Sequence, residues 1–372
     1  MPARRLRRLL RHWGAKVIRF GLIGCGRVAP RHAQSLAQLP HTQLVAVADL
    51  KQSRADRFAV EAGIDPGRDA YLDYRALLER SDVDAVSICV PSGLHAQVAR
   101  DALDAGKHVL VEKPIALSLE DADAMIAAAN ARGLTLGVVL QNRYNHPMRQ
   151  LRTAIDEGKL GPLHLGAATV RWYRPQSYYD DGWHGTWAMD GGALMNQSIH
   201  HIDALQWFMG DVEAVSAYTT TRAHTMEAED IGVAILRFKS GALATVEGST
   251  VTWPENLEGS VSVFGASGSV KIGGTALNRI VLWKVDGMVE QEAEILTSQV
   301  VDPPSVYGYS HRAVIDDFAG ALLEGRPVGT PGSAARRSLA LVLAIYSAAQ
   351  GQREVRLDAP LADATPILQV TA

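Results

Sequence analysis

The spacing of hydrophobic residues changes near residue 141. Before that point, short runs rich in Val, Ile and Leu alternate with stretches whose apolar residues recur every three or four positions. The runs predict buried strands, and the wider spacing predicts helices packed against them. The predicted strands are Arg19–Ile23, Leu44–Ala48, Ala85–Val90, His108–Val111 and Thr135–Val139. The predicted helices are Arg31–Leu39, Arg54–Ala62, Tyr74–Glu79, His95–Ala105 and Leu119–Ala131. This alternation indicates an α/β domain with a doubly wound parallel sheet.

Beyond Gln141, most strands follow one another with turn signals between them, such as Lys239-Ser240-Gly241 and Ala266-Ser267-Gly268. The predicted strands are Leu163–Tyr173, Ala214–Thr221, Ile231–Phe238, Leu243–Val251, Val261–Phe264, Ser269–Ile272 and Ile280–Val285. The predicted helices are Pro147–Glu157, Gln197–Met209, Ser310–Leu323 and Ser333–Gln350. Hairpins indicate a mostly antiparallel second sheet. A wide sheet needs cover on both faces, so we expect it to pair subunits into a homo-oligomer, a dimer or a tetramer.

The length of 372 residues suits two domains, which the pattern assigns to 17–140 and 141–372. Residues 1–16 form a basic arm with arginines at positions 4, 5, 7, 8 and 11. The arm has no sustained apolar core, which argues against a signal peptide. We interpret it as a frayed arm or as residues upstream of the natural start, in preference to a membrane or polyanion contact.

Composition narrows the class of protein. The 37 basic residues nearly balance the 40 acidic ones, so the chain as a whole has no electrostatic footprint for nucleic acid. No apolar run approaches the ~20 residues that cross a bilayer. Cys25 and Cys89 fall in predicted buried positions without metal-type neighbours. We interpret them as reduced core residues and expect a cytoplasmic enzyme with no nucleic-acid or membrane partner.

The most informative motif is Gly24-x-Gly26-x-x-Ala29, which joins the first predicted strand to the first predicted helix. Gly24 allows the tight turn, Gly26 lets the backbone approach a pyrophosphate, and Ala29 keeps the helix close to the sheet. Asp49 ends the second strand about twenty residues later, where a carboxylate would accept the ribose hydroxyls of the adenosine. The pattern therefore predicts a dinucleotide site. Its predicted contacts are Gly24, Gly26, Arg27, Val28 and Asp49.

Asp49 also bears on the choice of cofactor. Its carboxylate would repel a 2′-phosphate, which favours NAD. Lys51 and Arg54 follow closely and would offset part of that repulsion, which leaves NADP as the alternative.

Two segments carry candidate proton-transfer residues. Lys113 follows a predicted strand at the edge of the sheet where a nicotinamide would lie, and it can donate a proton to a hydroxyl or carbonyl oxygen. The alternative is a solvated turn lysine. If a helix begins at Asn196 or Gln197, Asn196 and His200 share one face. A histidine suits proton removal near neutral pH, and the alternative is a histidine that only satisfies a polar group at a domain interface.

No metal is predicted. His200, His201 and Asp203 are too close in sequence to form a ligand set alone, and no H-E-x-x-H motif or cysteine pair supports one.

Aromatic side chains are concentrated between Arg171 and Trp187. Because sugar rings stack on Trp and Tyr, this concentration favours a carbohydrate site, with a domain-packing loop as the alternative. Gln141–Asn145 follows the last parallel strand at the same ligand-binding edge, and Arg143 suits a carboxylate or diphosphate. The predicted substrate contacts are Lys113, Arg143, Tyr144, Trp172, Tyr179, Trp183, Asn196 and His200.

Taken together, these motifs resemble those of the Gfo/Idh/MocA family, which includes glucose–fructose oxidoreductase and inositol dehydrogenase. The matching segments are Gly24–Ala29, Val90–His95, Ala105–Pro114 with its Gly-Lys-His-Val…Glu-Lys-Pro run, and Gly191–Asp203. The resemblance implies a Rossmann domain followed by an α/β domain with an open, mostly antiparallel sheet. It also implies nicotinamide-dependent oxidation or reduction of a sugar or polyol.

The same resemblance implies roles for single residues. Lys113 matches the family's active-site lysine, and His200 matches its catalytic histidine. Asn196 stands where the commonest pattern has an aspartate; an amide cannot act as a base, but it can orient Lys113 or a substrate hydroxyl. The predicted catalytic set is therefore Lys113, His200 and Asn196. Further cofactor contacts are expected at Pro91, Ser92, His95, Glu112, Lys113 and Gln141.

Within the family, Gln141–Asn145, Trp183–Trp187 and Leu194–Gln197 resemble a subgroup that includes UDP-N-acetylglucosaminuronate 3-dehydrogenases, where Asn196 is usual. This implies an NAD(P)-dependent dehydrogenase that oxidises a secondary hydroxyl of a sugar or nucleotide sugar. The alternatives are a ketosugar reductase or an inositol or polyol dehydrogenase. A rival of another class is a sugar- and NAD(P)-sensing regulatory protein without turnover.

Overall fold

The predicted parallel sheet is present in the computed structural model, which describes residues 16–288, 292–297 and 306–357. The predicted basic arm lies outside these residues except for Lys16. Six parallel strands run in the order β3-β2-β1-β4-β5-β6. Their bounds are β1 Ile18–Ile23, β2 Thr42–Ala48, β3 Ala70–Tyr71, β4 Ala85–Ile88, β5 His108–Val111 and β6 Leu136–Val138. The helices of this part are α2 Ala29–Ala37, α3 Gln52–Ala62, α4 Pro66–Asp69, α5 Tyr74–Leu78, α6 His95–Asp104 and α7 Leu119–Arg132.

Alternate residues of the central strands pack on opposite faces of this sheet. In β5, Val109 and Val111 join the core beneath α6 and α7, whereas Leu110 joins the core beneath α2. Burial on both faces explains why these strands read as continuous apolar runs. The carboxyl ends of the strands therefore remain the open edge, where ligands of such sheets bind.

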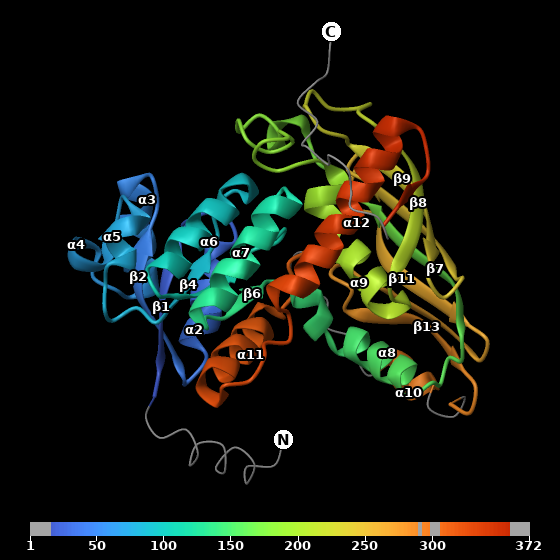
Figure 1. The fold of residues 1–372 in the computed structure, drawn as a ribbon, viewed down its shortest axis with the longest axis horizontal. Coiled ribbons are helices and arrows are strands. Elements are labelled where there is room, and N and C mark those ends of the chain that lie inside the picture. Colours follow the sequence, from blue (N-terminus) through green and yellow to red (C-terminus); the bar gives the residue numbers. More distant parts are fainter. Residues whose placement is uncertain (1–15, 289–291, 298–305, 358–372) are drawn as a thin grey trace.

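A helix from far along the chain completes one face of the parallel sheet. α11 (His311–Glu324) packs against α2 and β1, and the Phe318 ring lies 6.1 Å from that of Phe20. Figure 1 shows α11 beside α2, on the side of the molecule that carries the blue strands. The parallel sheet thus depends on both halves of the sequence.

The second sheet has eight strands in the order β13-β12-β11-β7-β10-β9-β8-β14. Neighbouring strands are antiparallel except for β7 and β10. The strands are β7 Leu163–Arg171, β8 Val212–Thr220, β9 Ile231–Phe238, β10 Leu243–Ser249, β11 Glu258–Gly265, β12 Gly268–Gly273, β13 Arg279–Val285 and β14 Val355–Arg356. The accompanying helices are α8 His146–Asp156, α9 Ile199–Met209, α10 Glu292–Thr297 and α12 Gly332–Gly351. The prediction of a mostly antiparallel sheet is confirmed.

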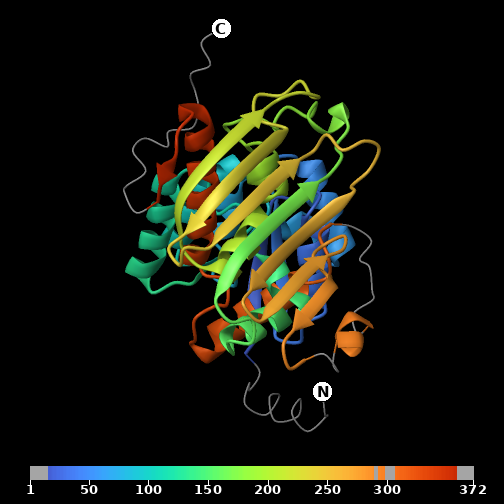
Figure 2. The same ribbon diagram turned by 90° about the vertical axis from the view of Figure 1, so that its right-hand side faces the viewer.

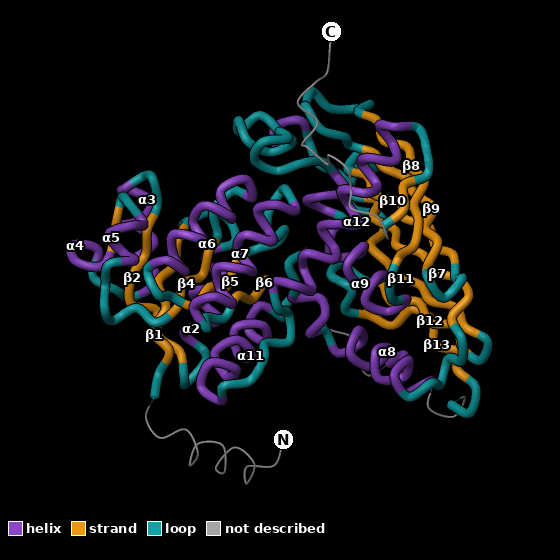
Figure 3. The backbone as a smooth tube through the Cα atoms, viewed as in Figure 1, coloured by secondary structure: helices purple, strands orange, loops and turns teal. Residues whose placement is uncertain are grey.

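Within the described parts of the chain, helices cover one face of this second sheet and leave the other without a helix. α9 packs on β7 and β11, and α12 packs on β8; Figure 3 shows both helices between the two groups of strands. Figure 2 looks onto the other face, across which no helix runs. The exposed apolar residues Leu165, Tyr218, Val233, Ile235 and Leu243 belong to its strands, and Tyr218 pairs with Val233 as Leu165 does with Leu243.

Some short elements were not predicted from the sequence. β3, β14 and α4 have two to four residues, too few for a period of two or 3.6 to register. The predicted helix from Gln197 begins two residues late: α9 starts at Ile199, after a π-helical turn over Ala193–Gln197. Asn196 therefore lies in the π turn and not on the α-helix that carries His200. Among the helices of the described residues, none is long and apolar enough to cross a membrane.

Candidate active site

The glycine loop between β1 and α2 has the geometry of a phosphate-binding turn. Gly24 has a φ of 94°, and a Cβ there would lie 2.7 Å from the carbonyl carbon and oxygen of Cys89. At Gly26, no atom of the described part of the chain lies within 4 Å of an added Cβ. Gly24 is therefore required by the protein itself, whereas the space at Gly26 is left for a ligand. The turn leads into the N-terminus of α2, which favours a phosphate.

Asp49 lies next to this loop, just beyond the end of β2. Its Oδ2 accepts a hydrogen bond from the backbone N–H of Cys25 at 3.0 Å, and its Oδ1 accepts one from Lys51 at 2.9 Å. A guanidinium nitrogen of Arg54 lies 3.6 Å from Oδ2. The predicted ribose-binding carboxylate is thus fixed beside the pyrophosphate turn, as a dinucleotide requires.

The segment after β4 packs against the second domain. Ser92 begins a 3-10 turn over Ser92–Leu94 with Pro91 at its N-cap. A Cβ on Gly93 would lie 2.1 Å from the carbonyl oxygen of Ala188. His95 is buried, with Nδ1 2.7 Å from the Pro114 carbonyl oxygen and Nε2 3.0 Å from that of Val90. Its ring thus ties together the chain after β4 and β5, and its nitrogens face backbone oxygens.

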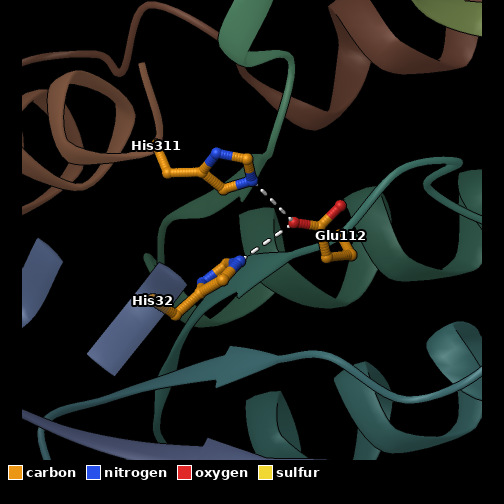
Figure 4. A group of neighbouring side chains, drawn as sticks. All are labelled: His32, Glu112 and His311. Carbon is orange, nitrogen blue, oxygen red and sulfur yellow. Dashed lines mark hydrogen bonds and ion pairs between the residues drawn. The ribbon is translucent and has the colours of Figure 1, made fainter. Parts of the chain in front are cut away.

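Glu112, predicted to line the cofactor, lies in a buried group with two histidines from distant elements (Figure 4). Its Oε1 is 2.9 Å from Nε2 of His32 on α2 and 3.5 Å from Nε2 of His311 at the start of α11. Although burial alone would raise the pKa of Glu112, the imidazoles of His311 and His32 beside its carboxylate hold that pKa well below its ordinary value. Burial alone would lower the pKa of His32, but Cys89 and Glu112 raise it to about 10.

These three side chains are the group of potential metal ligands that the described residues contain. The Ser87 hydroxyl lies 2.7 Å from Nδ1 of His32, and Oε2 of Glu112 accepts a hydrogen bond from the backbone of Lys113 at 3.2 Å. A 2.9 Å contact between imidazole and carboxylate is a charge-assisted hydrogen bond. We therefore interpret the group as an ion network that fixes the backbone of Lys113.

Lys113 reaches across to the π turn of the second domain. Its Nζ donates to the side-chain Oδ1 of Asn196 and to the backbone carbonyl of Asn196, each at 3.0 Å. Burial lowers the pKa of Lys113, while the charges of Glu112 and Asp190 raise it. Lys113 is thus held by two acceptors in a partly buried setting and is not a solvated turn lysine.

Asp190 contacts Asn196 through the amide nitrogen, whereas Lys113 contacts the amide oxygen. Nδ2 of Asn196 donates to Oδ1 of Asp190 at 2.7 Å, and the backbone N–H of Gly185 donates to Oδ2 at 2.9 Å. With a carboxylate on one side and an ammonium on the other, the amide of Asn196 can take only one orientation. Burial raises the pKa of Asp190 to about 6. The motifs in the sequence predict no role for Asp190.

His200 lies close to the same group. Its Nε2 is 3.2 Å from the amide nitrogen of Gln141, and its Nδ1 has no partner among the residues that the structure describes. Burial and the nearby Lys113 cation lower the pKa of His200 well below its ordinary value. The imidazole is therefore neutral near pH 7 and able to accept a proton.

Two of the predicted substrate contacts have internal partners instead. Nε and Nη2 of Arg143 donate to the two oxygens of Asp203 at 2.7 and 2.6 Å; Asp203 is buried and Arg143 is partly buried. The hydroxyl of Tyr144 donates to Asp317 on α11 at 2.8 Å. Packing between elements uses these polar groups, so a substrate contact of Arg143 or Tyr144 would have to compete with the bonds to Asp203 and Asp317.

The aromatic residues predicted to contact substrate lie against other side chains of the second domain. Trp172 and Tyr179 are buried, and the Tyr179 hydroxyl donates to Thr250 at 2.9 Å. Trp183 stacks on His184 with ring centroids 3.6 Å apart. The tyrosine that reaches Asn196 is Tyr178, whose hydroxyl accepts from Nδ2 of Asn196 at 3.3 Å.

These contacts bring together residues from both domains at the open edge of the parallel sheet. Lys113, Asn196, Asp190, Tyr178 and His200 offer a held ammonium, a neutral imidazole and an aromatic ring beside a dinucleotide-type loop. Such a set can bind a hydroxylated ring and accept the proton of a hydroxyl group.

Comparisons with known proteins agree with this geometry. The model of the GFO/IDH/MocA oxidoreductase family with an NAD-binding Rossmann fold matches residues 18–140, and that of the GFO/IDH/MocA C-terminal domain matches residues 148–271. The structure is similar to the WlbA dehydrogenase of Bordetella pertussis in complex with NADH and UDP-GlcNAcA. The two share 36% identity over 93% of this chain and 99% of that one, with a TM-score of 0.85.

Two further proteins are similar over nearly their whole lengths. WlbA of Chromobacterium violaceum, also in complex with NADH and UDP-GlcNAcA, is 35% identical over 94% of this chain and 98% of that one, with a TM-score of 0.85. The myo-inositol 2-dehydrogenase of Thermotoga maritima is 26% identical over 92% of this chain and 99% of its own.

Proposed function

Because this chain belongs to the GFO/IDH/MocA family of NAD-binding oxidoreductases, we propose that it oxidises a secondary hydroxyl of an N-acetylated nucleotide-sugar uronate such as UDP-GlcNAcA. The observation that carries this proposal is the 36% identity to a dehydrogenase structure bearing NADH and UDP-GlcNAcA, over 93% of this chain. C3 of the sugar is the proposed site of oxidation, in keeping with the subgroup that the motifs resemble.

The loop geometry supports NAD as the cofactor. The open space at Gly26 and the carboxylate of Asp49 beside it suit the diphosphate and ribose, and Asp49 favours NAD over NADP. When bound, NAD supplies the acceptor for the hydride that leaves the sugar carbon. Arg27, Val28, Pro91 and Ser92 are proposed as further cofactor contacts.

We propose that Lys113 and the side chains around it bind the reacting hydroxyl and remove its proton. Lys113 holds the reacting hydroxyl by a hydrogen bond from Nζ, which two acceptors already orient. The neutral imidazole of His200 accepts the proton as hydride leaves, and Gln141 orients that imidazole. Asn196 positions Lys113, and Asp190 fixes the Asn196 amide.

The proposed homo-oligomer, a dimer or a tetramer, forms through the uncovered face of the second sheet. Exposed apolar side chains such as Tyr218 and Ile235, 79% and 59% exposed, support this pairing. A cytoplasmic location is proposed because the two cysteines are free and buried.

The test is NADH formation by purified protein with UDP-GlcNAcA, UDP-GlcNAc, myo-inositol and a neutral aldose, each paired with a thermal-shift measurement. We expect NADH from UDP-GlcNAcA. NADH from myo-inositol alone would favour the polyol dehydrogenase alternative, which the Thermotoga maritima relative represents. Thermal stabilisation by a sugar without NADH formation, and without the reverse reduction of a ketosugar, would favour the sensor and overturn the proposal.

A further inference from the structure

Arg174 forms no ion pair with a carboxylate in the described parts of the chain. Its Nη1 donates to the backbone carbonyl of Tyr173 at 2.6 Å and to Oδ1 of Asn256 at 3.1 Å. Its Nε and Nη2 have no acceptor within 16–288, 292–297 and 306–357. This is the edge of the guanidinium that binds a carboxylate side-on.

Other arginines of this protein use that same edge for carboxylates. Nε and Nη2 of Arg19 bind Asp84, those of Arg143 bind Asp203, and those of Arg171 bind Glu247. These three arginines therefore have internal partners, and Arg174 has the matching pair of donors without one.

The guanidinium of Arg174 is held in place by aromatic rings. Its central carbon lies 5.2 Å from the ring centroid of Trp172 and 5.6 Å from that of Tyr178. Cation–π contacts of this kind, together with the two acceptors on Nη1, restrict the side chain to a narrow set of orientations. The remaining donors are thus preorganised, which lowers the entropic cost of binding an anion.

The same tyrosine connects Arg174 to the centre of the site. The Tyr178 hydroxyl lies 3.3 Å from Nδ2 of Asn196, whose Oδ1 accepts from Lys113. Arg27 of the glycine loop also lies over the Tyr178 ring, at 5.5 Å. Arg27 and Arg174 therefore both contact this tyrosine, and Lys113 is joined to it through Asn196. None of the three cations forms an ion pair with a residue that the structure describes.

We propose that Nε and Nη2 of Arg174 bind the carboxylate of the sugar ring while Lys113 and His200 face its reacting hydroxyl. This inference rests on the proposed function and names the residue that selects an acidic sugar. A carboxylate offers two coplanar oxygens that match the guanidinium fork, and a neutral hydroxymethyl group does not. A neutral sugar would leave the donors of Arg174 unpaired, and unpaired polar groups are a strong source of discrimination.

The experiment compares kcat/KM for UDP-GlcNAcA with kcat/KM for UDP-GlcNAc, which differ only at this group and share the diphosphate. The variants are Arg174→Met, Arg174→Lys and the control Arg132→Met, which removes a surface arginine on α7 that pairs with Asp104. In Arg174→Met, kcat/KM is expected to fall about 10²-fold for UDP-GlcNAcA and less than about 3-fold for UDP-GlcNAc. Only the acidic sugar loses a charge-assisted hydrogen-bonded pair. Arg174→Lys keeps the charge but not the fork and should lie between; Arg132→Met should match the wild type.

Equal losses on both sugars in Arg174→Met would overturn the inference, because a diphosphate contact or a folding defect acts on both alike. The same comparison is made by calorimetric binding of each sugar to the wild type and to Arg174→Met in the presence of NAD. If the wild type forms no NADH, the proposed function fails. A preference for the acid that Arg174→Met abolishes would still support the carboxylate site, and the absence of such a preference would overturn it.

Discussion

The ammonium of Lys113 and the buried carboxylate of Asp190 are joined through a single side-chain amide. Asn196 accepts from Lys113 Nζ at 3.0 Å and donates to Asp190 at 2.7 Å. No ion pair links the two charged groups within the described residues, so the carboxylate acts on Lys113 by orienting the amide and by its field. Asn196 is thus in place to orient Lys113 without carrying a proton itself.

Asp190→Asn should change the pH dependence of catalysis. Above pH about 6, the Asp190 carboxylate is charged and raises the pKa of Lys113. Without that charge, the limb of the kcat/KM profile that reports Lys113 should move to lower pH. Loss of the fixed amide should also reduce kcat by about ten-fold or more. The control is Asp180→Asn, an exposed neighbour in the same loop; a profile of Asp190→Asn identical to wild type would exclude this role.

Lys113→Met and His200→Gln should each reduce kcat by about 10²–10⁴-fold, the usual cost of removing a positioned proton-transfer group. His200 is not among the expected cofactor contacts, so NAD affinity in His200→Gln should stay within about 3-fold of wild type. Lys113→Met also removes an expected cofactor contact, so its kcat at saturating NAD is the quantity compared. Steady-state kinetics and NAD titration by fluorescence check both statements. A variant with near-normal turnover would remove its residue from the catalytic set.

Gly24→Ala and Gly26→Ala form a matched pair at the cofactor loop. The first places a Cβ 2.7 Å from backbone atoms of Cys89 at a positive φ, so it should lower the Tm of the NAD-free protein. The second meets open space and should leave that Tm unchanged while weakening NAD binding about ten-fold or more, because its methyl group occupies the place of the phosphates. Unchanged NAD affinity in Gly26→Ala would contradict this position of the diphosphate.

Arg143 should prove structural. Arg143→Met leaves the Asp203 carboxylate buried beside Ser338 without its cation, and breaking such a pair costs about 3–5 kcal/mol of unfolding free energy. Urea denaturation measures this loss, and Arg143→Met/Asp203→Asn should recover part of it. A variant of normal stability that fails only on acidic sugars would return Arg143 to the substrate site.

Ile235→Asp should split the proposed oligomer. The change places a carboxylate in the apolar face of the second sheet, where pairing would bury it without a partner. Light scattering should then report a smaller mass than that of the wild type. Leu72→Asp, at an exposed apolar residue outside this sheet, is the control. A wild type that is already monomeric would contradict the pairing.

The sequence alone predicted the glycine loop, Lys113 and His200 as site residues because each lies within a contiguous motif. It could not show which arginines are free to bind a substrate and which are paired with an acidic residue of the protein. Whether Arg143 or Arg174 has an internal acid depends on Asp203, which approaches only when α9 packs beside the loop after β6. Tyr178 contacts Asn196, whereas the predicted Tyr179 contacts Thr250, because the two residues lie at the end of the 3-10 turn Gln176–Tyr178 and point in different directions.

Asp190 illustrates another limit. Asp190 lies six residues before Asn196, but this spacing does not place the two on one face of a helix, because Gly191 and Gly192 separate Asp190 from the start of the π turn. The contact between the two side chains exists only in three dimensions. The sequence likewise could not predict that α11 packs on the parallel sheet, because the apolar stripe of this helix would fit the core of either domain.

The His32–Glu112–His311 group has a consequence for how this protein is made. Glu112 and His32 emerge from the ribosome early, while His311 and α11 follow only after strands β7 to β13 of the second sheet have been synthesised. Until then, Phe20 lacks its aromatic neighbour Phe318, and the carboxylate before Lys113 lacks one of its two imidazoles. The nucleotide-binding half is therefore completed late although its sheet is translated first, and a nascent chain should acquire its cofactor only after α11 has been synthesised.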